Sequence, residues 1–192
     1  MIDDLIRKNR SCRRFYQDHA VDLDTLEGLV NLARLSASAG NLQPLKYILS
    51  KEPKRNAAIF ECLAWAGYLE DWKGPKTGER PAAYIIVMAD TRISRDAGCD
   101  HGIACQSILL GARERGLAGC IIGAVKRKRL RELFRIPEHL DILLVVALGK
   151  PREIAVVETV DPDESIEYWR DEKSVHHVPK RKLSDIILDT GK

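Results

Sequence analysis

Apolar residues recur along this chain at two spacings, one typical of helices and one of buried strands. Continuous apolar runs predict buried strands at residues 45–50, 82–90, 117–125 and 141–151. Apolar positions at helical spacing predict helices at residues 2–9, 22–38, 53–63, 100–116 and 126–136. Asp22 is the expected N-cap of the second helix. Small residues follow one side of the fourth helix. Strands that alternate with helices predict an α/β or α+β fold.

The chain reads as a single domain, residues 1–192, without an internal repeat or an interdomain linker. Residues 66–81 mix aromatic residues, Gly, Pro and charges without a clean period, so we expect a lid or substrate loop there. After Pro151 the chain becomes polar and irregular. We therefore expect residues 152–192 to form an extension that wraps over the body or over a partner subunit.

Composition and charge narrow the function classes. The 31 Lys and Arg residues nearly balance 28 Asp and Glu, and the resulting net charge of +3 is lower than is usual for a nucleic-acid-binding domain. The N-terminus lacks the apolar core of a signal peptide, and no apolar run approaches the ~18 residues that span a bilayer. The five cysteines are odd in number and form no CxxC, which argues against a disulfide framework or a zinc ribbon. We expect a cytoplasmic protein with no membrane partner.

Several catalytic and binding motifs are missing from the sequence. It contains no GxGxxG, no P-loop, no HExxH and no GxSxG. His176 and His177 lack a third ligand at convincing spacing, so we expect no metal site. The run KRKRLR at residues 126–131 has no interleaved aromatic residues, which favours a solvated helix face over a nucleic-acid-binding surface.

Two short segments are candidates for ligand contact. Arg10, Ser11 and Arg13 place two guanidinium groups and a hydroxyl within four residues, a donor set that suits a phosphate dianion. A second basic cluster at residues 180–182 could reach the same phosphate, although spacing alone does not show it. Residues 37–44, ASAGNLQP, combine small residues with the amides of Asn41 and Gln43. This segment is either a contact to a flat ligand or a simple turn between a helix and a strand.

Taken in order, these segments resemble the nitroreductase family of FMN-dependent oxidoreductases. The family pattern R-R-S-x-R-x-F is matched by residues 9–15, and P-S-S-x-N-x-Q-P-W by residues 37–45. Further along, D-x-G-x-A, G-L-G-x-x-x-I-G, L-G-K/Y-P and a basic pair are matched at residues 100–104, 116–123, 148–151 and 180–182. The chain departs from the pattern where Ala39, Leu45 and Ile121 replace Ser, Trp and Pro.

The resemblance implies an α+β sandwich, with a mostly antiparallel central sheet flanked by helices, in an interlocked homodimer that binds FMN at its interface. Carried over by position, Arg10, Ser11 and Arg13 would hold the FMN phosphate from one side, and Lys180 and Lys182 from the other. The remaining implied contacts to the isoalloxazine are Ser38 and Asn41 from the partner chain, and the backbone of Ile121, Ile122, Gly123 and Ala124.

The same resemblance implies a ping-pong reaction. NADH or NADPH would pass a hydride to flavin N5 and leave, and a small oxidised acceptor such as a nitroaromatic, a quinone or a flavin would then be reduced. No catalytic side chain is expected, because the cofactor carries the chemistry. The alternatives are a reductive dehalogenase or flavin-modifying enzyme on the same fold, a non-catalytic flavin sensor, and a nucleic-acid-binding module.

Overall fold

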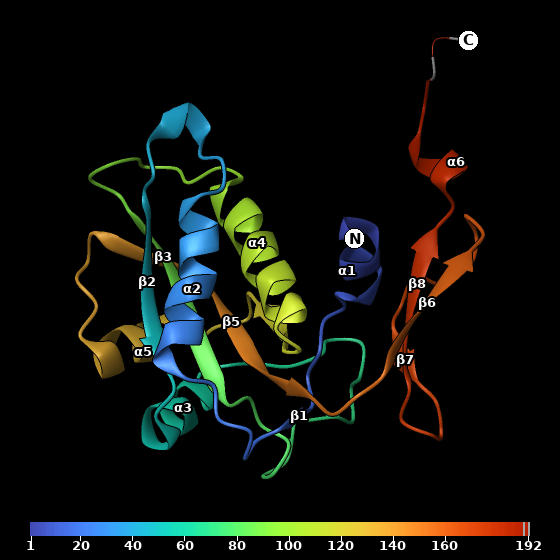
Figure 1. Ribbon diagram of the computed structural model, residues 1–192, viewed down its shortest axis with the longest axis horizontal. Coiled ribbons are helices and arrows are strands. Elements are labelled where there is room, and N and C mark those ends of the chain that lie inside the picture. Colours follow the sequence, from blue (N-terminus) through green and yellow to red (C-terminus); the bar gives the residue numbers. More distant parts are fainter. Residues whose placement is uncertain (190, 192) are drawn as a thin grey trace.

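The main sheet has five antiparallel strands (Figure 1). The computed structural model describes residues 1–189 and 191. Strand β3 (Ala83–Asp90) lies between β2 (Leu45–Ser50) and β5 (Leu140–Pro151). The opposite edge of β5 pairs with β4 (Ala118–Ile122), and the C-terminal end of β5 pairs with the two-residue β1 (Phe15–Tyr16). The expected antiparallel central sheet is therefore confirmed.

Helices cover both faces of this sheet. Helices α2 (Leu23–Arg34) and α4 (Asp100–Glu114) pack on one face, and α3 (Pro53–Phe60) and α5 (Arg127–Phe134) on the other. Strand β3 is buried on both sides, because Ile85 and Val87 join the core under α2 and α4 while Ile86 and Met88 join the opposite core. Two helical layers around a sheet confirm the α+β sandwich.

Small residues on one side of α4 let α2 and α4 approach closely. The sequence predicted these small residues on the helix at residues 100–116. A Cβ added at Gly111 would lie 2.2 Å from Leu32 Cδ1. Asp22 caps α2 as expected, because its side chain accepts a hydrogen bond from Thr25 N at 2.7 Å. The helix ends at Arg34, earlier than its apolar pattern predicted, and leads into a 3-10 turn, η1 (Ala39–Asn41).

The strand expected at residues 117–125 is also shorter, since β4 ends at Ile122. Beyond it, the backbone leaves β5 and turns to the segment after α3. Ala64 N donates to Ala124 O at 3.0 Å, and Lys126 N donates to Cys62 O at 2.8 Å. Residues 124–126, just after β4, are therefore hydrogen-bonded to residues 62–64.

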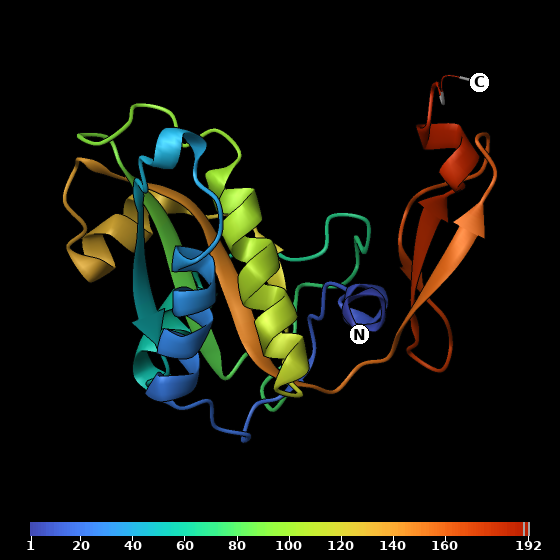
Figure 2. The same cartoon turned by 45° about the horizontal axis from the view of Figure 1, so that its top comes forward.

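The segment after Pro151 is more regular than its sequence indicated. It forms a second sheet in which β8 (His176–Arg181) pairs in parallel with β6 (Ala155–Val160) and antiparallel with β7 (Trp169–Arg170), followed by the short α6 (Leu183–Ile186). This sheet stands to one side of the main sheet, and α1 (Ile2–Lys8) lies between them in both views (Figures 1 and 2). The extension thus has its own hydrogen-bonded structure. The polar residues in its strands gave no apolar pattern from which this structure could be predicted. Among residues 1–189 and 191, no helix is long and apolar enough to cross a membrane.

Candidate active site

A cavity of about 220 Å³ lies at the C-terminal end of β4. Its wall contains Arg13 from the N-terminal segment and the backbone turn from Cys120 to Ala124. The opposite wall consists of residues 64–67, at the start of the expected lid. Five of the residues expected to contact a flavin therefore converge here: Arg13, Ile121, Ile122, Gly123 and Ala124.

Close packing fixes the N-terminal segment against β4. Cys12 N donates to Gly119 O at 2.9 Å. Gly119 has no room for a side chain, because an added Cβ would lie 2.5 Å from Ala147 O. Burial raises the pKa of the Cys120 thiol, and interactions with Arg13 and Ser11 lower it in part. Ser11 directly precedes Cys12 in this segment but is not part of the wall of the Arg13 cavity.

Arg13 is the main charged group of this cavity, although only 8% of its surface is exposed. Its Nη1 lies 3.2 Å from His176 Nε2, and its guanidinium lies 4.6 Å from the centre of the Tyr168 ring. Burial lowers the pKa of His176 to about 4, an effect that Glu153 opposes and Arg13 reinforces. The imidazole is therefore neutral at pH 7 and its Nε2 accepts from Arg13. No carboxylate in the described part of the chain forms an ion pair with this guanidinium.

The nearest carboxylate, Glu153, has other partners. It accepts hydrogen bonds from the backbone N–H groups of Arg13 and Arg14, the latter at 3.3 Å, and from Arg170 Nη2 at 2.8 Å. These bonds fix the N-terminal segment to the C-terminal sheet, and Glu153 neutralises Arg170. Glu153 therefore orients the backbone of Arg13, while the negative charge of Glu153 is paired with Arg170.

Arg10 lies outside the cavity wall and has a structural contact of its own. Its Nη2 donates to Ile6 O and its Nε to Asn9 O, both at 2.7 Å. These carbonyls are at the C-terminal end of α1, where unpaired carbonyl groups favour a cation. Arg10 is thus held close to Ser11 and Arg13 with part of its hydrogen-bonding capacity already used.

The C-terminal lysines are not brought to this cavity within one chain. Lys180 is four residues beyond His176 on β8, which corresponds to roughly 13 Å along a strand. Lys182 forms an ion pair with Asp161. The C-terminal sheet does meet the N-terminal segment, but through His176 rather than through the basic cluster. The assignment of Lys180 and Lys182 to a phosphate stays a prediction.

Ser38 and Asn41 line no part of the Arg13 cavity. Ser38 Oγ donates to Asp100 Oδ2 at 2.6 Å, and Ala39 N donates to Asp100 Oδ1 at 2.9 Å. Asn41 has a φ of 54°, in the left-handed region that Asn tolerates. Ser38 and Asp100 also line a separate cavity of about 200 Å³ between α2, α4 and β2. The assignment of Ser38 and Asn41 to a flavin stays a prediction.

Three residues near Arg13 were not among the predicted flavin contacts, namely Trp65, Tyr168 and His176. Trp65 lines the cavity and its Nε1 is buried without a hydrogen-bond partner among the described residues. The Tyr168 ring lies 4.9 Å from Tyr68 in the expected lid. Isolated aromatic residues in segments without periodicity gave no signal. His176 was considered only as a metal ligand.

The expected lid is anchored at both ends. Near its start it packs on β7, where Arg170 lies 4.4 Å from the centre of the Trp72 ring. Near its end, the buried Glu79 accepts two hydrogen bonds from Arg14, at 3.1 and 2.8 Å. Ala66 and Gly67 line the cavity, and the contacts of Trp72 and Glu79 hold the rest of the segment, whose role as a lid stays a prediction.

The basic run at residues 126–131 binds backbone carbonyl groups. Arg127 donates to Ile142 O and Leu143 O, each at 2.8 Å, and Arg131 donates to Leu140 O at 2.9 Å. These bonds hold α5 against the start of β5. Folding therefore accounts for Arg127 and Arg131, and the absence of nucleic-acid binding stays a prediction.

The sequence of this chain is similar to those of known proteins. The model of the Nitroreductase family matches residues 6–150. A protein of Archaeoglobus fulgidus assigned as an NADH dehydrogenase/NAD(P)H nitroreductase is 30% identical over 148 residues, which cover 73% of this chain and 80% of the relative. A protein of Methanothermobacter thermautotrophicus with the same assignment is 30% identical over 173 residues, which cover 85% of each chain.

A solved structure extends the match to the fold. An FMN-dependent nitroreductase from Clostridium difficile R20291 superposes with a TM-score of 0.65, at 21% identity, over 90% of this chain and 94% of that chain. The family model spans the Arg13 segment and the main sheet up to residue 150. The sequence match and the fold therefore support the same family. This chain belongs to the nitroreductase family.

Proposed function

We propose that this protein is an FMN-dependent oxidoreductase that uses NADH or NADPH to reduce small oxidised acceptors such as nitroaromatics, quinones or flavins. One observation carries the proposal. Arg13 is buried, has a neutral histidine as its partner, and faces the cavity beside the backbone of residues 121–124. Burying a guanidinium without an opposite charge is costly, so an anionic group of a ligand at this position would supply the missing partner.

The residues present fit FMN. Arg13, Ser11 and Arg10 would hold the phosphate, with Lys180 and Lys182 as further cations. The backbone from Ile121 to Ala124 would lie along the isoalloxazine, since Gly123 leaves open space where a side chain would stand. Support for FMN also comes from the structural relative, which is described as FMN-dependent.

When bound, FMN would supply hydride acceptance and donation at its N5 atom. The chain's own residues bind and orient the ligand and exclude water from one side of it. Trp65 and the segment anchored by Trp72 and Glu79 form that side. No side chain of the cavity is required as an acid or base, because positioning and electrostatics are the protein's contribution.

We further propose a homodimer with the site at its interface, in a cytoplasmic protein that binds neither nucleic acid nor membrane. Support comes from the fact that Arg13 and Ser38 line different cavities. In a homodimer, the Ser38 loop of the partner could contact a flavin bound at Arg13. In this arrangement residues 152–192, of which Thr190 and Lys192 lie outside the described residues, would extend toward the partner.

A visible spectrum of the purified protein tests the function. We expect flavin absorption bands, bleached when NADH or NADPH is added anaerobically and restored by a nitroaromatic or a quinone. A protein that binds no flavin under any reconstitution condition would contradict the proposal. Bound flavin that neither nucleotide reduces would favour a flavin sensor instead.

A further inference from the structure

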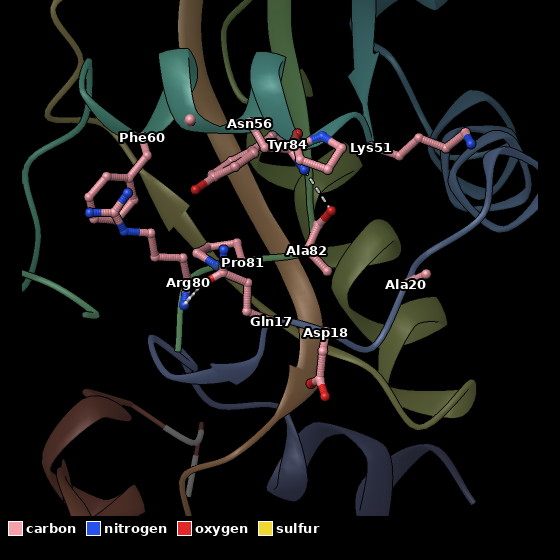
Figure 3. Close-up of a pocket in the computed structure, with 12 residues that line it drawn as sticks. Gln17, Asp18, Ala20, Lys51, Asn56, Phe60, Arg80, Pro81, Ala82 and Tyr84 are labelled. Carbon is pink, nitrogen blue, oxygen red and sulfur yellow. Dashed lines mark hydrogen bonds between the residues drawn. The ribbon is translucent and has the colours of Figure 1, made fainter. Parts of the chain in front are cut away.

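A second cavity, of about 290 Å³, shares no residue with the Arg13 cavity (Figure 3). One wall is a single face of α3, formed by residues at positions i, i+3, i+4 and i+7: Pro53, Asn56, Ala57 and Phe60. The facing wall contains residues 80–82 and Tyr84 at the start of β3, and Gln17, Asp18, Ala20 and Lys51 complete the lining. We propose that this cavity binds a small carboxylate with an apolar body.

Arg80 provides a cation that the fold does not neutralise. Its guanidinium lies 4.0 Å from the centre of the Phe60 ring, and its Nε is buried without an acceptor among the described residues. The adjacent carboxylate, Glu79, is paired with Arg14 at 2.8 Å and with Arg152 at 3.8 Å. The charge of Arg80 is therefore available to an anion in the cavity.

Tyr84 provides a neutral donor in the same cavity. The residue is 1% exposed, and its side chain lines the cavity. Burial raises the pKa of this phenol and nearby Arg80 lowers it in part, so the hydroxyl keeps its proton at pH 7. In Figure 3 the hydroxyl points toward the side of the cavity where Phe60 and Arg80 lie. Because Tyr84 lines the cavity, a ligand bound there can accept the hydrogen bond of its hydroxyl.

The walls around these two groups are rigid. Asn56 Nδ2 donates to Ala82 O at 2.7 Å, and its Oδ1 accepts from Ser50 Oγ at 2.8 Å. Gln17 Oε1 accepts from Gly78 N at 2.7 Å and from Arg80 N at 3.3 Å. These amides fix the walls and the backbone of Arg80. A preformed site loses little conformational entropy when it binds a ligand.

The remaining lining indicates the chemical class. A carboxylate accepts two parallel hydrogen bonds from a guanidinium and can also accept one from the phenol. Pro53 and Pro81 offer no N–H group, which disfavours a phosphate that needs several donors. Small apolar residues, namely Ala20, Ala57 and Ala82, leave space for an apolar body. The volume is at the small end of the range for ligand pockets.

Titration of the purified, flavin-containing protein with benzoate tests the proposal, with calorimetry and the flavin spectrum as readouts. We expect saturable binding of benzoate, at least tenfold weaker binding of neutral benzamide, and an unchanged flavin spectrum. Tyr84→Phe, which removes only the hydroxyl, and Arg80→Gln should each weaken benzoate binding by about tenfold or more. The exposed Arg95→Gln is the matched control and should bind as the parent does.

Circular dichroism of each variant confirms folding, and Tyr84→Phe keeps the buried ring in place. Benzoate that fails to saturate the parent protein would overturn the proposal. Binding that shifts the flavin bands and ignores both substitutions would place benzoate at the flavin, and would also overturn it. Tighter binding of inorganic phosphate than of benzoate would refute the carboxylate class. None of these outcomes depends on reduction by NADH or NADPH, so the proposed function is tested separately.

Discussion

Arg13 Nη1 lies 3.2 Å from His176 Nε2, a contact between residues 163 positions apart in the sequence. Because His176 is buried and neutral, it orients the guanidinium of Arg13 without cancelling its charge. Tyr168 lies against the same guanidinium and also contacts Tyr68. One buried arginine thus connects the N-terminal segment, the C-terminal sheet and the expected lid.

The lowered pKa of His176 predicts a loss of stability in mild acid. Between pH 6.5 and about 4 the unfolded chain binds a proton that the folded chain does not, so the free energy of unfolding falls as the pH falls. This contribution is at most on the order of 3 kcal/mol. Urea denaturation from pH 7 to pH 4 should show a shallower decline for His176→Asn than for the parent.

The neighbouring His177 is the matched control, because hydrogen bonds from its ring to Glu158, with a smaller contribution from Asp171, raise its pKa. Its contribution to stability is present below pH 6.5 and is lost as the pH rises through the raised value. His177→Asn should therefore keep the acid-dependent decline of the parent. Equal slopes for the parent and His176→Asn would show that His176 is not held neutral by burial.

Asp100 should be important for the conformation of the Ser38 loop. Its carboxylate is 4% exposed and accepts from Ser38 Oγ and Ala39 N. It also lies in the first turn of α4, where a negative charge is favourable. Asp100→Ala should lower the free energy of unfolding by about 2–3 kcal/mol, as measured in urea. Asp24→Ala, in the exposed first turn of α2, should change it by less than about 1 kcal/mol.

Glu79 should anchor the lid to the N-terminal segment. It is 3% exposed, and hydrogen bonds from Arg14 lower its pKa. Glu79→Gln leaves the half-buried guanidinium of Arg14 partly unpaired and should cost about 2–4 kcal/mol. Limited proteolysis should cleave residues 66–78 faster in this variant than in the exposed control Glu114→Gln. Unchanged cleavage rates would mean that the lid is held at this end by other contacts.

Most of the main fold could be predicted from the sequence. The continuous apolar runs of β3 and β5 are buried on both faces, and such runs have few other interpretations. The C-terminal sheet could not be predicted in this way. Polar residues occupy half of its strand positions, and β8 begins with His176 and His177 and contains Pro179. Its hydrogen-bonded pairing depends on contacts distant in sequence.

The candidate site was predictable where a short motif carries several ligand-type groups together. Arg13 and the turn at residues 121–124 belong to such motifs, and they converge on one cavity. The contact between Arg13 and His176 gave no sequence signal, because 163 positions separate the two residues and a single histidine has many roles. Lys180 and Lys182 are the opposite case. Their charge pattern is clear in the sequence, but within one chain they do not line the Arg13 cavity.

The central claim is that Arg13 binds the phosphate of a flavin, and a comparison of FMN with riboflavin tests it most directly. Riboflavin lacks the phosphate, so the apo protein should bind FMN far more tightly, as measured by quenching of flavin fluorescence. Arg13→Gln should weaken FMN binding by about 10–100-fold and leave riboflavin binding nearly unchanged, because a hydrogen bond to a charged group contributes about 1.5–3 kcal/mol. An equal loss for both flavins, or no loss for FMN, would contradict the claim.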